Sequence, residues 1–194
     1  MRTQLRIVAG SLKGRKVSCT VAPDLRPMPD RVRESLFNIL ADAVVDRAFY
    51  DLFAGTGAVG LEALSRGASE AEFIERDGRL IGAISGHLQS FGMASQACVR
   101  RADVYRWAER WQAPAEPVII FLGPPYPDYA QQSEELMRVI RTLQGKVAPG
   151  SILVLQSEKS LDTLALPAAE AWDHRQYGRN QLSFWTRTNS QEEQ

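Results

Sequence analysis

Short strand-like segments alternate with longer segments of helical periodicity along most of the chain. The expected strands are AFYDLFA (48–54), EAEFIE (70–75), QACVRR (96–101), PVIIFL (117–122) and SILVLQS (151–157). Apolar residues recur at helical spacing between them, near 57–66, 77–91, 104–111 and 130–145. Because buried strands separated by helices favour a parallel sheet covered on both faces, the pattern predicts an α/β fold.

The two ends of the chain depart from this alternation. LRIVAGSLKGRKVSC (5–19) has two strand-like runs around a Gly/Ser/Lys loop, which predicts a β-hairpin. The proline-rich 21–29 predicts an extended linker, after which Asp30 is expected to cap a helix that continues to about Ala43 with its apolar residues mostly on one face. DHRQYGRNQLSFWTR (173–187) predicts a strand, a Gly-Arg-Asn turn and a closing antiparallel strand at one edge of the sheet.

Composition limits the class of protein. The 194 residues suit one domain with a good core, and no apolar run approaches the roughly 20 residues that span a bilayer. The N-terminus lacks a signal-peptide pattern, so we expect a cytoplasmic protein. Cys19 and Cys98 make neither a disulfide framework nor a metal site, and His87 and His174 lack metal-ligand spacing, so no metal is expected.

Charge is balanced overall but not along the chain. Lys and Arg total 23, as do Asp and Glu, whereas residues 1–33 carry eight basic residues against Asp24 and Asp30. A basic end on a neutral protein is typical of a protein that binds a polyanion. A solvated surface hairpin would give the same pattern.

The end of the first buried strand carries the clearest chemistry. Asp51 is followed by Phe53-Ala54-Gly55-Thr56-Gly57, and a helix opens at once. Glycines there allow the backbone to turn tightly and to approach a ligand. Glu75, which ends the next strand about 20 residues on, stands where an acid accepts hydrogen bonds from ribose hydroxyls in nucleotide folds. Either feature alone is weak, but together they favour an adenosyl-type ligand.

The glycines alone do not exclude a dinucleotide, because Gly60 completes a G-x-G-x-x-G spacing. Asp51 argues against one, since a carboxylate beside the turn would repel a pyrophosphate and could hold a cationic amine. A Walker lysine is absent from GTGAVGLEAL. Asp103, after the third strand, could accept from an adenine amine or could be a surface acid.

FLGPPYPDY (121–129) follows the fourth buried strand. Prolines there could hold a backbone carbonyl outward, and Tyr126 offers a flat ring for stacking a planar base. Such a segment could grip an amino group on a heterocycle next to a methyl donor. A plain proline-rich loop is the alternative.

Several blocks of sequence, in this order, resemble a known family. RIVAGSLKGRKV, RPMPDRVRESLFNIL, DLFAGTGAVGLEALSRGA and QYGRNQLSFW resemble the RsmD-type bacterial 16S ribosomal RNA guanine-N2 methyltransferases, from Arg6 to about Trp185. DLFAGTG, LEALSRGA, FIERD and PPY also resemble the wider class I S-adenosylmethionine-dependent methyltransferases of nucleic acid amino groups.

The resemblance implies a Rossmann-like class I methyltransferase fold: a seven-stranded, mostly parallel sheet with one antiparallel strand, plus an N-terminal β-hairpin. It implies a basic RNA-binding hairpin (1–22), a methyltransferase domain (23–188) and a disordered tail (189–194). The implied reaction transfers methyl from S-adenosylmethionine to N2 of a guanine in 16S rRNA. The partner would be 16S rRNA, the small ribosomal subunit or its assembly intermediate, and we expect a monomer that contacts no membrane.

The resemblance also assigns site residues by position. The cofactor set is Asp51, Phe53, Ala54, Gly55, Thr56, Gly57, Glu75, Arg76 and Asp103, with Glu75 on the ribose and Asp103 facing the adenine. The catalytic segment is Gly123, Pro124, Pro125 and Tyr126. The RNA set is Arg6, Lys13, Arg15, Lys16, Arg31 and Arg33; Asn38 shares the signature helix of the last two and could equally be a packing residue.

The sequence departs from the family at the catalytic segment. Gly123 stands where the family has Asp or Asn before Pro-Pro-Tyr, so the side-chain oxygen that accepts from the target amine is missing. Met28 replaces a usual threonine, and His87 stands where asparagine is common. Two alternatives therefore stay open: a catalytically impaired rRNA-binding assembly factor, and a methyltransferase of another amino group, such as adenine N6 or a protein glutamine.

Overall fold

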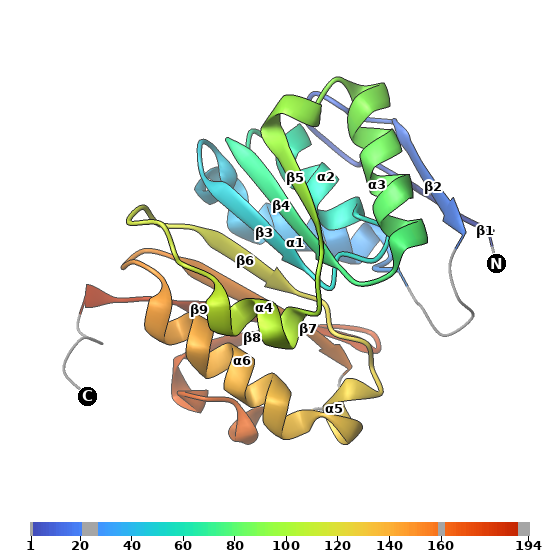
Figure 1. The fold of residues 1–194 in the computed structure, drawn as a ribbon. Helices are drawn as coiled ribbons and strands as arrows, with labels where there is room; N and C mark the ends of the chain where they lie inside the picture. The colour runs from blue at the N-terminus through green and yellow to red at the C-terminus, as the bar shows by residue number, and fades with distance from the viewer. Residues whose placement is uncertain (1, 21–26, 159–161, 190–194) are drawn as a thin grey trace. The chain divides into compact units, whose positions relative to one another are not determined.

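The computed structural model describes residues 2–20, 27–158 and 162–189 (Figure 1). Residues 21–26 of the predicted linker (21–29) and residues 190–194 of the predicted tail (189–194) lie outside these residues. The strands are β1 (Arg2–Arg6), β2 (Lys16–Thr20), β3 (Ala48–Leu52), β4 (Glu70–Glu75), β5 (Ala97–Arg101), β6 (Ile119–Leu122), β7 (Ile152–Glu158), β8 (Trp172–Tyr177) and β9 (Asn180–Thr186). The α-helices are α1 (Asp30–Leu40), α2 (Ala58–Ser65), α3 (Gly78–Phe91), α4 (Val104–Arg110), α5 (Asp128–Gln131) and α6 (Ser133–Lys146).

The strands form a two-stranded sheet and a seven-stranded sheet. β1 and β2 make the predicted antiparallel hairpin, and the larger sheet has the order β5-β4-β3-β6-β7-β9-β8. β4 pairs parallel with β3 and β5, and β6 pairs parallel with β7. β9 runs antiparallel to both of its neighbours. The α/β fold with one antiparallel strand, predicted from the sequence, is therefore confirmed.

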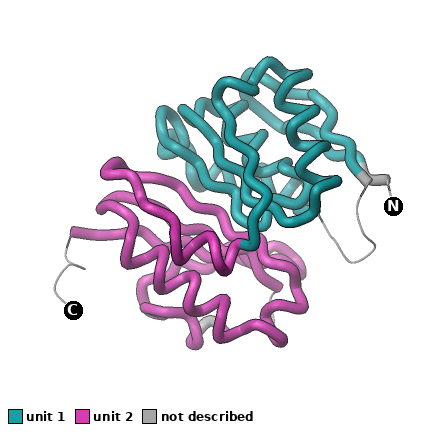
Figure 2. The backbone as a smooth tube through the Cα atoms, viewed as in Figure 1, with its two compact units in different colours: residues 1–103 teal, residues 104–194 magenta. Residues whose placement is uncertain are grey.

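The chain divides into two compact units, residues 1–103 and 104–194 (Figure 2). The boundaries predicted at 22/23 and 188/189 stay predictions.

In the first unit, the N-terminal hairpin shares a core with the sheet. Ile7, Leu12 and Val17 are buried in one cluster with Phe73 of β4 and Ile84 of α3. Figure 1 shows the hairpin alongside α3, and His87 of that helix places its Nε2 2.9 Å from the carbonyl oxygen of Ser18. Because burial of apolar surface is the main driving force of folding, the hairpin is part of the folded unit.

Helix α1 begins differently from the prediction. Asp30 was expected to cap the helix, but Pro29 is the N-cap and makes no side-chain capping bond. Asp30 is instead the first helical residue, and its Oδ1 accepts a hydrogen bond from Arg33 Nη2 at 3.0 Å. The α-helix ends at Leu40 and a 3₁₀ turn continues to Val44, close to the predicted end.

In the second unit, two helices follow β6 where the sequence predicted one. Residues expected to be helical from 130 belong to the short α5, and α6 starts at Ser133. The Lys146 ammonium at the end of α6 donates to the carbonyl oxygens of Ala108, Glu109 and Trp111, each at 2.8 Å. It thereby satisfies carbonyls that the end of α4 leaves without helical partners.

Candidate active site

The turn after β3 is built from residues with left-handed backbone. Phe53, Gly55 and Gly57 have φ of 60°, 54° and 73°, and Gly57 is the N-cap of α2. Glycine adopts this conformation freely, whereas a phenylalanine there is strained. Strained non-glycine residues concentrate at ligand sites, which supports the predicted role of this turn.

Asp51 lies under the turn and is almost fully buried, at 1% exposure. Its Oδ2 accepts a hydrogen bond from Gly60 N at 2.9 Å. Loss of hydration raises the pKa of Asp51 to about 8, and the nearby Glu75 adds to the rise. Among the described residues, no cationic side chain pairs with Asp51. A buried acid without a cation fits a site whose ligand brings its own positive charge.

Glu75 ties the end of β4 to the turn. Its Oε2 accepts from Gly55 N at 2.8 Å, and its Oε1 accepts from Arg76 N at 2.8 Å and Asp77 N at 2.9 Å. A carboxylate has about four acceptor positions, so these three bonds leave one. Glu75 therefore shapes the turn and can offer at most one further hydrogen bond to a ribose hydroxyl.

The remaining predicted cofactor residues lie around this turn. Ala54 N donates to the carbonyl of Ile74, and Thr56 Oγ1 accepts from Ala58 N at the start of α2. Arg76 is exposed. Ala102 N donates to the carbonyl of Glu75 at 3.0 Å, which brings Asp103 to the same end of the sheet as Glu75.

A buried acid that the sequence reasoning missed holds the hairpin to α2. Glu62 accepts from Val8 N at 2.8 Å, Ala9 N at 3.0 Å and Arg66 Nε at 2.9 Å, and it pairs with Arg33 Nε at 3.4 Å. The available signal was a single acid within the apolar run AVGLEAL, whose neighbours are all buried.

Arg33 requires a correction. It was predicted to contact RNA, but its side chain has 0% exposure. Besides Glu62 and Asp30, its guanidinium donates to the carbonyl oxygens of Met28 and Arg6. Because Arg33 is buried and bonded to the hairpin, it attaches the hairpin to the unit and is not a candidate RNA contact.

The other predicted RNA residues lie on the surface of the first unit. The exposed ones are Arg6, Lys13, Arg15, Lys16 and Arg31. Asn38 is exposed as well, so its side chain is not packed inside the unit. The Arg15 guanidinium lies 5.6 Å from the centroid of the Phe91 ring, a cation–π distance.

The proline segment lies in the second unit. Gly123 follows β6 directly, Pro124 is buried and Pro125 is exposed. Tyr126 is half-buried, and its hydroxyl donates to Asn180 Oδ1 at 3.3 Å. This hydrogen bond holds the phenol end of the Tyr126 ring to Asn180, a residue 54 positions further along the chain.

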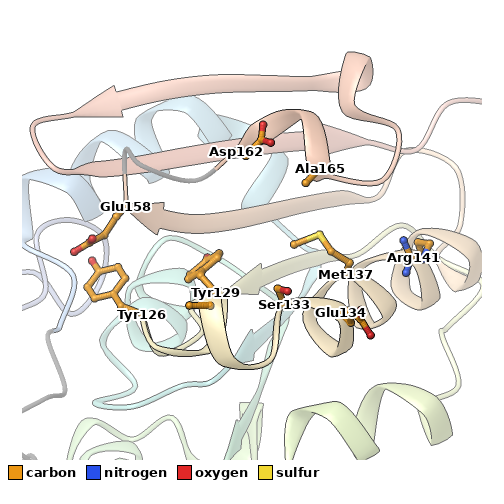
Figure 3. A pocket seen from close by; sticks show the side chains of 10 residues that line it. Tyr126, Tyr129, Ser133, Glu134, Met137, Arg141, Glu158, Asp162 and Ala165 are labelled. Carbon is orange, nitrogen blue, oxygen red and sulfur yellow. The ribbon is translucent and has the colours of Figure 1, made fainter.

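Tyr126 also lines a cavity of about 750 Å³ (Figure 3). Tyr129, Met137, Arg141 and Glu158 are among the other residues around it. Burial raises the pKa of Tyr129, whose hydroxyl donates to the carbonyl of Gln156, so this phenol stays neutral. The cavity thus combines aromatic rings, on which a planar base could stack, with charged side chains of both signs: Arg141 and the carboxylates Glu134, Glu158 and Asp162.

Within residues 2–20, 27–158 and 162–189, no group of three or more His, Cys, Asp or Glu side chains could hold a metal ion. No helix of the described chain has both the length and the apolar character needed to cross a membrane.

Comparison with known proteins places these features in a family. Residues 5–186 match the model of the family described as conserved hypothetical protein 95. The chain is 34% identical over 182 residues to ribosomal RNA small subunit methyltransferase D of Escherichia coli K12, covering 93% of this chain and 88% of that protein. It is 35% identical over 142 residues to the Bacillus subtilis rRNA methyltransferase YlbH, covering 72% and 76% of the two chains.

Solved structures give the same picture. The E. coli methyltransferase yhhF superposes with a TM-score of 0.77 at 33% identity, covering 96% of this chain and 99% of that chain. An RNA methyltransferase of Salinibacter ruber, solved with S-adenosyl-L-homocysteine, superposes with a TM-score of 0.61 at 18% identity, covering 87% and 98%. At that identity the second likeness speaks for the fold alone.

Proposed function

Since the chain belongs to the family of ribosomal RNA small subunit methyltransferase D, we propose that it methylates the exocyclic N2 of a guanine in 16S rRNA. The observation that carries the proposal is the glycine turn with a buried Asp51 that pairs with no cationic side chain of the described residues, in a chain that matches this family over residues 5–186. The methyl donor is S-adenosylmethionine, and the partner is 16S rRNA in the small subunit or its assembly intermediate.

The cofactor residues in this proposal are Asp51, the turn 53–57, Glu75 and Asp103. S-Adenosylmethionine supplies an electrophilic methyl group on a sulfonium. Asp51, as a carboxylate, would pair with a positive charge of the ligand, and the backbone of the turn would lie against it without side chains in the way. The remaining acceptor position of Glu75 would serve a ribose hydroxyl, and Asp103 would accept from the adenine amine.

The catalytic residues would be those of the proline segment. The amine of guanine is a weak nucleophile because its lone pair delocalises into the ring. The protein would therefore accelerate the reaction mainly by positioning the amine against the methyl group. Stacking on Tyr126, whose ring is oriented by Asn180, would hold the base in place. The Pro124 carbonyl could accept from the amine as its nitrogen gains positive charge.

RNA would be bound by the exposed basic residues of the first unit, Arg6, Lys13, Arg15, Lys16 and Arg31. Because Glu62 and Arg33 fix the hairpin to α2, these charges are held in place before RNA arrives. Prearranged charges lose less conformational entropy on binding than mobile ones.

Small subunits from cells that lack this protein provide the test. The purified protein with methyl-labelled S-adenosylmethionine should label 16S rRNA, and nucleoside analysis should find the label on guanine N2. Labelling of another atom would overturn the guanine assignment.

Gly123 favours one alternative, an rRNA-binding assembly factor without catalysis. Binding of small subunits and of S-adenosylmethionine, with no label transferred in a single turnover, would establish that alternative.

A further inference from the structure

Gly123 leaves the catalytic segment without its own side chain, but the side chain of Gln156 lies next to it. A Cβ built on Gly123 would lie 3.9 Å from Oε1 of Gln156. A carboxylate oxygen on residue 123 would itself lie about 2.4 Å from that Cβ, from ordinary bond lengths. A carboxylate oxygen directed at Gln156 would therefore end about 1.5 Å short of the Gln156 amide oxygen, which places this oxygen next to the reach of a motif carboxylate.

The surroundings of Gln156 fix which end of its amide faces Gly123. Its Nε2 donates to Asn180 Oδ1 at 3.2 Å, the same oxygen that accepts from the Tyr126 hydroxyl at 3.3 Å. With the amide nitrogen directed at Asn180, the amide oxygen is directed away from it. None of the described residues donates a hydrogen bond to Oε1. This oxygen is not a fully buried atom either, so it stays open to a ligand.

The backbone of Gln156 is equally well held. The residue lies inside β7, opposite Leu182 of β9, and is 9% exposed. Its carbonyl accepts from the Tyr129 hydroxyl. An acceptor on a central strand, oriented by a second side chain, is prearranged in the manner that stabilises developing charge most effectively.

We propose that Gln156 is a catalytic residue that supplies, from β7, the side-chain acceptor that Gly123 lacks, and that Asn180 positions it. The inference rests on the proposed function. The amine donates an N–H hydrogen bond to Gln156 Oε1, which aligns the nitrogen lone pair for attack.

The lone pair of the amine forms the new N–C bond to the methyl group, and the electron pair of the breaking S–C bond passes to sulfur. The nitrogen is left with a positive charge and then loses its extra proton to water. Gln156 takes no proton, because an amide oxygen is a very weak base; it stabilises the charge while that charge exists.

A variant series tests the proposal. Gln156→Leu should lower the single-turnover rate on unmodified small subunits about 10²-fold, the usual effect of removing one such group. S-adenosylmethionine affinity should stay within about twofold, because the cofactor residues are untouched. Gln144→Leu is the matched control, since Gln144 is a buried glutamine of the same unit whose Nε2 donates to the Pro167 carbonyl. It should keep the rate of the unaltered protein.

Rescue separates chemistry from structure. Gly123→Asp in the Gln156→Leu background should recover most of the lost rate, whereas Gly123→Asp alone should change the rate much less. Gly123→Ala controls for the added Cβ, which would lie 3.0 Å from Cε1 of Phe121 and requires that ring to shift slightly. Equal gains from Gly123→Asp in both backgrounds would show that the two oxygens do not replace each other.

Binding gives a readout that needs no turnover. With S-adenosylhomocysteine present, a synthetic rRNA fragment with guanosine at the methylated position should bind the unaltered protein more tightly than one with inosine, which lacks the amine. Gln156→Leu should show a much smaller preference, because only the Pro124 carbonyl then remains to accept from the amine. The proposal is overturned if Gln156→Leu keeps the preference for guanosine and the rate. If the unaltered protein transfers no methyl group, the proposed function fails, and the inosine comparison still decides whether Gln156 recognises the amine.

Discussion

Arg33 Nε lies 3.4 Å from Oε2 of Glu62, and neither side chain is exposed to solvent. The pair joins α1 to α2, and each partner also holds backbone atoms of residues 6–9: Arg33 through the Arg6 carbonyl, and Glu62 through the Val8 and Ala9 amides. The attachment of the N-terminal hairpin therefore depends on two buried charges.

Removal of one partner should leave the other buried charge with a single remaining ion-pair partner, Asp30 for Arg33 and Arg66 for Glu62. We expect Arg33→Met or Glu62→Gln to lower the free energy of unfolding by up to about 3 kcal/mol, below the full cost of an uncompensated buried charge, measured by urea denaturation. Asp173→Asn is the control, because the Arg175–Asp173 pair is about half exposed on both sides, and should have little effect. Similar small losses in all three variants would contradict a structural role for the buried pair.

Reversal of exposed hairpin charges should act on RNA alone. Lys13, Arg15 and Lys16 changed together to Glu should weaken rRNA binding and flatten its salt dependence, by about 0.7–0.9 in logarithmic slope for each phosphate that the protein no longer neutralises. Cofactor affinity should change little, because these side chains are on the surface and the cofactor residues are untouched.

The control reverses three exposed arginines of the second unit, Arg110, Arg175 and Arg179, with the same change in net charge. If both triple variants weaken RNA binding equally, net charge rather than the hairpin determines affinity. If neither does, the hairpin is a solvated surface element.

Close packing against Phe73 explains why residue 60 is a glycine. A Cβ on Gly60 would lie 2.3 Å from Cε1 of Phe73, a fully buried residue of β4. Gly60→Ala should therefore destabilise the protein by about 1–3 kcal/mol. Gly82→Ala is the matched control, because Gly82 lies in α3 with nothing within 4 Å of the added Cβ. It should stabilise by about 0.5–1 kcal/mol. Denaturant unfolding that shows the same sign for both variants would reject the packing explanation.

The fold was readable from the sequence because its signals are local. Glu70–Glu75 is a strand with the predicted bounds, since alternation and flanking polar residues mark both ends within a few positions. The start of α1 differs from the prediction: aspartate is a good N-cap, but Asp30 pairs with Arg33 and Pro29 occupies the cap position. Whether Asp30 caps the helix or pairs with Arg33 depends on a side-chain contact, and the sequence is compatible with both arrangements.

The parts of the site that the sequence did not predict are contacts between distant residues. Glu62 and Arg33 are 29 positions apart, and Gln156 and Asn180 are 24 apart. A polar residue within an apolar run indicates that some partner exists, because burial without one is costly, but does not identify the partner. The motif residues were found because they follow strands directly, where position alone limits their role.

The raised pKa of Asp51 makes the stability of the ligand-free protein depend on pH. With a pKa of about 8 in the folded state against an ordinary value of 3.8, the folded state binds more protons than the unfolded state between these values. Stability should therefore fall as pH rises from about 4 to 8, by up to about 1.4 kcal/mol per unit from this group. Urea unfolding at pH 5 and pH 8 should show that Asp51→Asn flattens the dependence.

The same acid should link cofactor binding to proton release. A cation bound beside Asp51 favours the carboxylate, so S-adenosylmethionine affinity should rise with pH up to about 8, the pKa of the free protein. Near neutral pH, Asp51 releases a proton on binding. Calorimetry in two buffers of different ionisation enthalpy measures that proton directly. The cofactor's own amine also titrates, but when unbound it does so equally in both experiments, so the difference between the two proteins reports Asp51 together with its effect on the bound amine. Identical proton release from both proteins would mean that Asp51 does not face the positive charge of the ligand, and the assignment of this turn to the methionine part of the cofactor would fail with it.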